Sequence, residues 1–289
     1  MKKIYVSICF LVILALVGCG TSSKQSKPSS SEPVLNYSNL LDTASQKEVE
    51  QQLTASLAEE DVTQFMEQVQ FYNDHIPTDS LVQSGYGQSD TLVPTYDVGA
   101  ISDKWVEEFP YFPGYNCRLT TFQLLQSAIR VAGTAPVDDS LLFIDKEALA
   151  DAPAIYQRTE AEQEIFKTLF GAVATENVSD TAVHAKKVQE YWQAQGVTFA
   201  TGKASMVSVW FHDQLEEAAT KLFIGHVGVL LPAEKGYLFI EKISFEEPYQ
   251  VVKFDKKQAV YDYLMKKYDV DETGSTKPFI MENDQEWSV

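Results

Sequence analysis

The chain has 289 residues, 45% of them hydrophobic and 12% aromatic, and it carries a formal net charge of −18. This much apolar side-chain surface can form a large core, either as one domain or as two small ones. The acidic balance argues against a nucleic-acid-binding protein, which needs a basic footprint. It also disfavours direct adsorption of the folded body to anionic lipid headgroups.

The first residues have the features of an export signal. Lys2 and Lys3 precede an apolar run over residues 8–17, which is too short to span a bilayer as a permanent helix. The run ends in Leu-Val-Gly-Cys, with Cys19 as its last residue. This sequence looks like a lipobox, so we expect residues 1–18 to be removed and the sulfur of Cys19 to carry a diacylglycerol. An ordinary signal peptide with an incidental cysteine is the alternative.

The segment after Cys19 is polar and rich in serine as far as residue 33, a composition typical of a flexible tether. We therefore divide the mature chain into a lipidated cysteine with its tether, over residues 19–35, and a single domain over residues 36–289. Arginine occurs at only three positions, against twenty lysines, a bias of AT-rich genomes. We expect a Gram-positive source and a protein that its lipid holds on the outer face of the cell membrane.

Hydrophobic periodicity predicts mainly helices in the first two thirds of the chain. Residues 76–100 are rich in Pro, Gly, Asp and Ser and predict a loop, and residues 105–115 form an aromatic segment broken by Pro and Gly. Three later helices make up a helical insertion over about 140–195. The expected helices are 45–58, 61–74 with Asp61 as N-cap, a helix from Asn116 to about Ala132, and helices near 145–152, 159–173 and 179–195.

The last third of the chain has the composition of strands. Its β-branched and aromatic runs are short and are separated by turn residues. They predict strands at 206–211, 226–231, 237–243 and 249–254, followed by a helix over 256–268 with Asp255 as N-cap. Helices followed by an antiparallel sheet predict an α+β fold.

Cys117 is the first residue that carries candidate chemistry. Once Cys9 leaves with the signal peptide and Cys19 is lipidated, Cys117 is the only thiol of the exported body. It lies at a predicted helix N-terminus, where free N–H groups and the helix dipole favour a thiolate. Arg118 adds a positive charge, and Asn116 is a good N-cap. The alternative is a small buried hydrophobic residue.

His226 is the second residue that carries candidate chemistry, and it lies at the start of a predicted strand. Gly228 shares its face of the strand, and the missing side chain there predicts that a helix can approach closely enough for sulfur and imidazole to meet. A core histidine bonded to a backbone carbonyl is the alternative. His212 is the rival base, whereas His75 and His184 are expected to be solvated.

Asn-Cys-Arg at a helix start, followed by His-Val-Gly-Val at a strand start, resembles the NlpC-type branch of the papain-like cysteine peptidases. The resemblance implies a papain-like helix packed on a C-terminal antiparallel sheet. It also implies that Cys117 is the nucleophile, that His226 is the base and that Glu241 on the next strand orients His226. We expect no metal and no cofactor. The segment YDVGAISDKWVEEFPYFPGYNCRL also resembles an uncharacterised family of streptococcal and enterococcal lipoproteins, which brings no known activity.

The strand register decides whether Glu241 reaches His226. If Leu231 pairs with Tyr237, His226 faces Lys242, whose ammonium group cannot accept a hydrogen bond from imidazole. A one-residue bulge or a tighter turn puts Glu241 there instead, because a slip of one residue exchanges the two faces of a strand.

A hydrolase also needs donors for the oxyanion that forms when the thiolate attacks an acyl carbon. Backbone N–H groups at the helix start can supply them. The hydroxyl group of Tyr111 or Tyr115 is a candidate extra donor, with aromatic packing as the other interpretation of both residues.

These features predict a lipid-anchored extracellular cysteine hydrolase that cleaves amide bonds, with peptidoglycan stem peptides as the expected substrate. The alternative is a binding or adhesion lipoprotein that keeps the scaffold without turnover and has peptidoglycan or a cell-surface protein as its partner. Crowding of Cys117 by Arg118 would favour this alternative. A solute-binding lipoprotein ranks below both, because the alternating strands and helices of two lobes are missing. An open cleft with sulfur within about 4 Å of imidazole would favour the enzyme, and a buried sulfur would favour the binding protein.

Overall fold

A computed structural model describes residues 35–287, apart from residue 217 and residues 273–274. The predicted signal peptide, Cys19 and most of the tether therefore lie outside the described residues. Within the described part of the chain, no helix combines the length and the apolar character that crossing a membrane would require.

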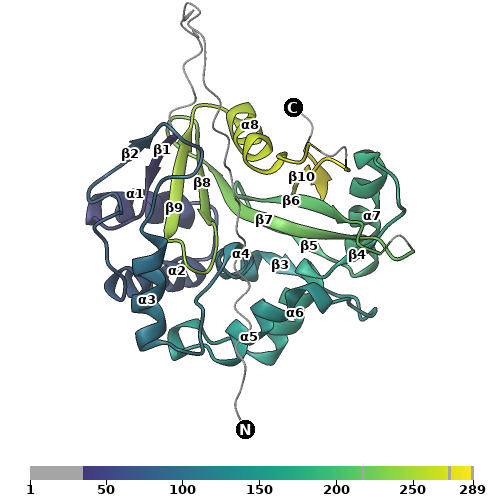
Figure 1. The fold of residues 1–289 in the computed structure, drawn as a ribbon, viewed down its shortest axis with the longest axis horizontal. Coiled ribbons are helices and arrows are strands. Elements are labelled where there is room, and N and C mark those ends of the chain that lie inside the picture. Colours follow the sequence, from purple (N-terminus) through teal and green to yellow (C-terminus); the bar gives the residue numbers. More distant parts are fainter. Residues whose placement is uncertain (1–34, 217, 273–274, 288–289) are drawn as a thin grey trace, which may run out of the picture. The chain divides into compact units, whose positions relative to one another are not determined.

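The main sheet is antiparallel throughout and has the strand order β11-β10-β6-β7-β8-β9-β1-β2, with β4 added beside β7 (Figure 1). A separate pair is formed by β3 and β5. The strands are β1 (Leu35–Ser38), β2 (Gly87–Ser89), β3 (Ile129–Arg130), β4 (Val173–Ala174), β5 (Thr198–Phe199), β6 (Ser205–Asp213), β7 (Lys221–Pro232), β8 (Tyr237–Lys242), β9 (Tyr249–Phe254), β10 (Phe279–Glu282) and β11 (Gln285–Glu286).

Helices cover both faces of this sheet. Rings of α2 contact Tyr249 on one face, whereas Tyr263 of α8 contacts Phe239 and Phe254 on the other. The helices are α1 (Thr43–Thr54), α2 (Glu59–Asp74), α3 (Val98–Glu108), α4 (Cys117–Leu125), α5 (Phe143–Ala150), α6 (Glu160–Phe170), α7 (Thr181–Ala194) and α8 (Lys257–Tyr268), with short 3-10 turns at 126–128, 140–142 and 154–156. The α+β class is thereby confirmed.

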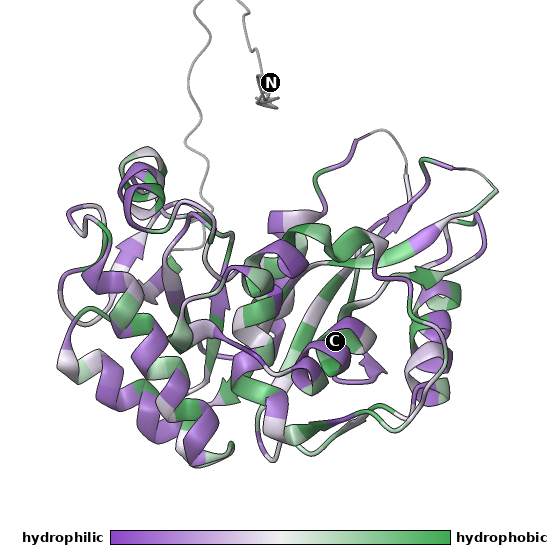
Figure 2. Ribbon diagram, turned by 90° about the horizontal axis from the view of Figure 1, so that it is seen from below, coloured by the Kyte–Doolittle hydropathy of each residue, from purple (hydrophilic) through white to green (hydrophobic). Residues whose placement is uncertain are grey.

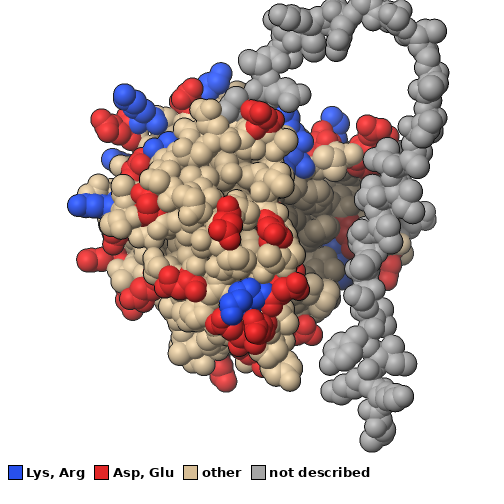
Figure 3. Space-filling view, turned by 60° about the vertical axis from the view of Figure 1, so that its left-hand side comes forward, with Lys and Arg blue, Asp and Glu red and all other residues tan. Residues whose placement is uncertain are grey.

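The core lies between the sheet and the helices. Figure 2 shows hydrophobic residues along the central strands and polar residues on the outer sides of the helices. Most side chains of β6 to β9 are buried, because both faces of the sheet are covered. The surface seen in Figure 3 carries scattered acidic side chains, in keeping with the net charge.

Two irregularities of β7 place the site. Strands β7 and β8 pair from Val229↔Ile240 to Pro232↔Tyr237 and then diverge. At the diverging end, α4 packs against both strands, and Arg118 donates a hydrogen bond to the carbonyl of Ile224 at 3.0 Å. A bulge beside β6 occurs at the same place. Bulges re-aim side chains next to functional sites, and here the re-aimed residue is His226.

Several predicted elements need correction. The helix that begins at Cys117 ends at Leu125 rather than near Ala132, and the chain continues as a 3-10 turn and β3. The predicted loop contains β2 and the start of α3, whose N-cap is Asp97. These elements are short, and the Pro and Gly residues around them hide their pattern.

Two predicted N-caps are also wrong. Asp61 lies inside the first turn of α2, where it is buried and accepts hydrogen bonds from the backbone of Ser127 and the side chain of Gln126. The helix at the chain end begins after Lys256, with no side-chain cap from Asp255. Asp61 therefore ties two helical segments together rather than starting one.

Candidate active site

Cys117 is the first residue of α4, and its local sequence explains the position. The side chain of Asn116 accepts a hydrogen bond from the backbone N–H of Leu119 at 3.1 Å, so Asn116 is the N-cap. The N–H groups of Cys117 and Arg118 have no acceptor within the helix. The thiol therefore lies at the positive end of the helix dipole, beside two free donors.

His226 and Glu241 form a short, buried ion pair. The Nε2 atom of His226 lies 2.6 Å from Oε2 of Glu241, and the two side chains are 1% and 0% exposed. The register explains this contact, because Pro232 pairs with Tyr237. This is the tighter of the predicted turns, and it places Glu241 on the face of His226 and Lys242 on the opposite face.

The carboxylate of Glu241 belongs to a buried network. Its Oε1 accepts hydrogen bonds from the hydroxyl of Tyr263 and from Nε2 of Gln250, the latter at 2.8 Å. The ammonium of Lys267 lies 3.6 Å from Oε2. Burial raises the pKa of Glu241, but Lys267, followed by His226 and Tyr263, lowers it to about 2. Glu241 is therefore a carboxylate at neutral pH and a strong acceptor for imidazole.

Cys117 and His226 shift each other's pKa in the directions that favour an ion pair. Burial raises the pKa of the Cys117 thiol, but the interaction with His226 and the charge of Arg118 bring it below its ordinary value. Burial lowers the pKa of His226, but Cys117 and Glu241 bring it above its ordinary value. Because Nε2 is bonded to Glu241, Nδ1 is the nitrogen left for the thiol. The arrangement favours thiolate and imidazolium.

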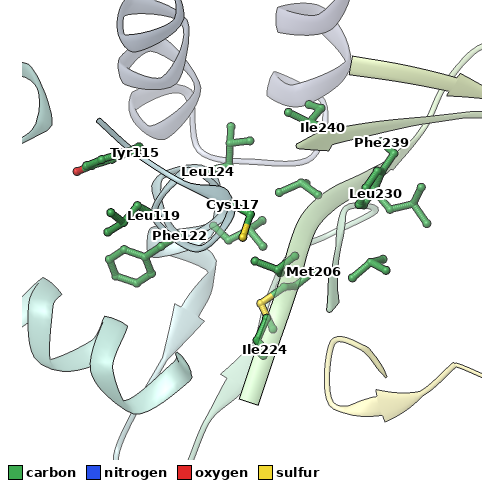
Figure 4. Packing of buried hydrophobic residues seen from close by; sticks show 14 of the residues in the cluster. Tyr115, Cys117, Leu119, Phe122, Leu124, Met206, Ile224, Leu230, Phe239 and Ile240 are labelled. Carbon is green, nitrogen blue, oxygen red and sulfur yellow. The ribbon is translucent and has the colours of Figure 1, made fainter. Parts of the chain in front are cut away.

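The site is closed. Cys117 is only 4% exposed and His226 only 1%. Figure 4 shows the Cys117 sulfur pointing from α4 toward β7, among the apolar side chains of the core. The sulfur is therefore buried rather than set in an open cleft. Gly228 also has another role than expected, because the ring of Phe239 fills the space above it.

The two neighbours of Cys117 in the chain are held by Asp145 of α5. The Asp145 carboxylate is 0% exposed and accepts from Asn116 at 2.8 Å and from Nε and Nη2 of Arg118 at 3.1 and 2.6 Å. Arg118 is thus turned to Asp145 and to the carbonyl of Ile224. Asp145 fixes both the cap and the cation beside the thiol.

Of the two tyrosines expected as candidate oxyanion donors, Tyr115 has its hydroxyl engaged elsewhere. Tyr115 is buried, and its hydroxyl donates to the carbonyl of Tyr156 at 2.5 Å and accepts from Arg158. It is a packing residue, so its predicted role as a donor is wrong. Tyr111 is 79% exposed.

The other histidines lie in different surroundings. His212 contacts Thr276 and the ring of His184, with ring centroids 4.3 Å apart. His184 is 0% exposed, and its nitrogens bond to Thr175 and to the carbonyl of Val178, so the expectation of a solvated residue is wrong. His75 is half-buried against aromatic rings rather than solvated.

Comparison with known proteins adds the family. Residues 36–287 match a family described as a domain of unknown function, DUF4300. The chain belongs to the DUF4300 family. No curated protein and no solved structure matches it. Among the residues that the structure describes, no group of three His, Cys, Asp or Glu side chains is arranged to hold a metal ion.

Sequence reasoning missed most of the residues that support the DUF4300 site. Gln250 lies opposite Glu241 on β9, and the predicted strands would have revealed it once their register was known. Tyr263 and Lys267 are four residues apart on α8 and reach Glu241 together. No sequence pattern indicated that Asp145 supports the site, because Asp145 lies in the segment predicted as a helical insertion.

Lys242 is a buried cation behind the site. Its ammonium donates to the carbonyls of Ser244 and Phe245 at 2.9 and 2.8 Å and lies 4.5 Å from the ring centre of Tyr72. Burial lowers its pKa to about 7, against the opposing effect of the carboxylates of Glu246 and Glu247 and of Cys117. Lys242 therefore holds the β8–β9 turn near Cys117, and its charge changes near neutral pH.

Proposed function

We propose that this protein is a lipid-anchored extracytoplasmic cysteine hydrolase that cleaves amide bonds, with peptidoglycan stem peptides as its substrate class. The observation that carries the proposal is the combination of three groups in one buried site. They are a thiol at a helix N-terminus, an imidazole that interacts with it, and a buried carboxylate 2.6 Å from that imidazole.

The chemistry follows from these positions. The Cys117 thiolate attacks the carbonyl carbon of the amide, and the N–H groups of Cys117 and Arg118 stabilise the negative oxygen. The imidazolium of His226 gives its proton to the leaving amine, and water then hydrolyses the thioester with His226 as base. Glu241 holds the imidazole and its charge throughout. This division of roles is similar to that of NlpC-type peptidases.

The anchor and the substrate class rest on the sequence. The basic start, the apolar run and Leu-Val-Gly-Cys at Cys19 support export and lipidation, and the serine-rich segment after them supports a tether. A hydrolase held on the outer face of the membrane meets the cell wall directly. The acidic surface of the body keeps it away from anionic headgroups.

One observation favours a second candidate, a binding or adhesion lipoprotein that performs no turnover. The sulfur is almost fully buried, as expected for a thiol with only a packing role. The ionisation of Cys117 separates the candidates, because a packing cysteine has no need of a lowered pKa.

The pH dependence of alkylation tests the hydrolase. In a chain of residues 20–289, which contains all the described core, Cys117 is the only thiol. We expect the rate with iodoacetamide to fall with decreasing pH around a midpoint below the ~8.5 of an ordinary cysteine, because His226 and Arg118 lower the pKa of the thiol. Closure of the site lowers the alkylation rate by the same factor at every pH and does not move the pH midpoint. The midpoint therefore reports the ionisation of Cys117.

Two variants sharpen this measurement. His226→Ala should move the midpoint to about 8.5 or above, because burial remains while the cationic partner is lost. Glu241→Gln should give an intermediate midpoint. A wild-type midpoint at or above about 8.5 would refute the thiolate and leave the binding lipoprotein as the better account.

A further inference from the structure

The imidazole of His226 is covered by a ring from another element. Tyr268, the last residue of α8, stacks on His226 with ring centroids 5.0 Å apart and an interplanar angle of 24°. Two more rings continue this layer. Phe211 meets Tyr268 edge-on at 6.2 Å and stacks with Phe223 at 5.7 Å. His226 therefore borders an aromatic surface, here defined as Tyr268, Phe211 and Phe223.

The bulge in β7 creates this surface. Val209 pairs with His226, whereas Phe211 pairs with Phe223, so one extra residue of β7 lies between the two pairs. Because Val209 and Phe211 share a face of β6, their partners share that face too. The ring of Phe211 occupies the space over Gly225, where an added Cβ would lie 2.3 Å from the ring. A side chain at residue 225 would force the ring away from its place beside His226.

The aromatic surface is the outer layer over the imidazole of His226. Its three residues are each partly exposed, while Cys117 and His226 beneath are almost fully buried. Burial, Glu241 and Cys117 raise the pKa of Tyr268, so its hydroxyl stays protonated and is no proton acceptor for the thiol. Tyr268 thus covers the imidazole of His226 without acting as a base.

We propose that Tyr268 is a gate, and that its ring occupies the place that an apolar or aromatic group of the substrate takes beside His226. The surface left when the ring turns out consists of the imidazole and the rings of Phe211 and Phe223, which suits a flat or apolar group next to the scissile amide. This inference rests on the proposed hydrolase and adds the character of its substrate.

The position of Tyr268 makes the gate physically reasonable. It is the final residue of its helix, where the chain leaves regular structure, and helix ends open at low free-energy cost. The network residues Tyr263 and Lys267 lie earlier on the same helix, where Tyr263 is 3% exposed and the side chain of Lys267 is 5% exposed. The ammonium of Lys267 also lies 5.5 Å from the ring centre of Tyr268. Outward rotation of Tyr268 removes that contact, but the contacts of Tyr263 and Lys267 with Glu241 do not depend on the Tyr268 ring.

Alkylation of the single thiol tests the gate. We expect Tyr268→Ala to react with iodoacetamide about 10- to 1000-fold faster than wild type, the range that corresponds to an open state populated at roughly 0.1–10%. Tyr268→Phe keeps the ring and should react at the wild-type rate. Thermal unfolding of all three chains shows whether they are folded. Equal rates in folded Tyr268→Ala and wild type would overturn the gate.

A pair of maleimides tests the substrate group. Each rate is divided by the rate of the same reagent with free cysteine. Tyr268→Ala should raise this relative rate more for N-phenylmaleimide than for N-ethylmaleimide. The additional change Phe211→Ala should remove the preference for the phenyl reagent. No preference for the phenyl reagent would overturn the aromatic subsite. The pH midpoint of alkylation is read separately, so an ordinary midpoint in an opened variant would refute the hydrolase while leaving the gate standing.

Discussion

Asp145→Ala should lower the free energy of unfolding by about 3–5 kcal/mol, measured by urea denaturation at pH 7. The Asp145 carboxylate is fully buried and accepts from both nitrogens that Arg118 directs at it and from Asn116. Its removal leaves a largely buried guanidinium without a counter-charge, and breaking such a pair costs far more than breaking an exposed one. The N-cap of α4 loses its side-chain support at the same time.

The same segment offers a matched control. Asp139 pairs with Lys146 at 3.0 Å, and both side chains are more than a third exposed. Asp139→Ala should therefore cost no more than about 1 kcal/mol. The double change Arg118→Met with Asp145→Leu should recover most of the stability, because it removes both buried charges. A loss from Asp145→Ala as small as that from Asp139→Ala would show that the pair does not support the site.

Lys242 should make the free energy of unfolding depend on pH, and Lys242→Met should remove this contribution. In the unfolded chain a lysine keeps its proton to about pH 10.4, whereas burial lowers the pKa of Lys242 to about 7 in the folded chain. Between these values the unfolded chain binds more protons, so stability rises with pH, by up to about 1.4 kcal/mol per pH unit. From pH 7 to 9.5 the expected gain is about 3 kcal/mol.

Comparison of wild type with Lys242→Met isolates this contribution. Both chains should also carry Cys117→Ala, so that titration of the thiol does not contribute. The difference between their unfolding free energies should change by about 3 kcal/mol over this pH range. Lys235→Met, at an exposed lysine, should leave the wild-type pH dependence intact. Parallel curves for Lys242→Met and its parent would mean that Lys242 keeps its ordinary proton affinity.

The sequence was sufficient for the parts of the site that depend on local chemistry. Asn116 is an N-cap because its amide oxygen can reach a free backbone N–H of the helix. Cys117 follows it in the sequence and therefore lies at the positive end of the helix dipole. Glu241 could be named, but its contact with His226 depended on a turn whose length the sequence left open. The register with Pro232 opposite Tyr237 decided it.

The rest depends on contacts between segments far apart in the chain, which no local pattern encodes. Asp145 reaches Asn116 and Arg118 from 27 or more positions away. Tyr268 reaches His226 only because α8 packs on that face of the sheet. Burial of the sulfur was also hidden, since it depends on how completely these segments close over Cys117. Helix ends were missed where Pro and Gly mask short elements, as around α3.

The most direct test of the hydrolase is digestion of purified peptidoglycan by the chain of residues 20–289, with new amino groups counted as bonds break. We expect release of amino groups by wild type, none by Cys117→Ala, and faster release by Tyr268→Ala on stem peptides with apolar groups beside the amide. Equal release by wild type and Cys117→Ala, or none from a wild-type chain whose thiol ionises below pH ~8.5, would contradict the proposed hydrolase.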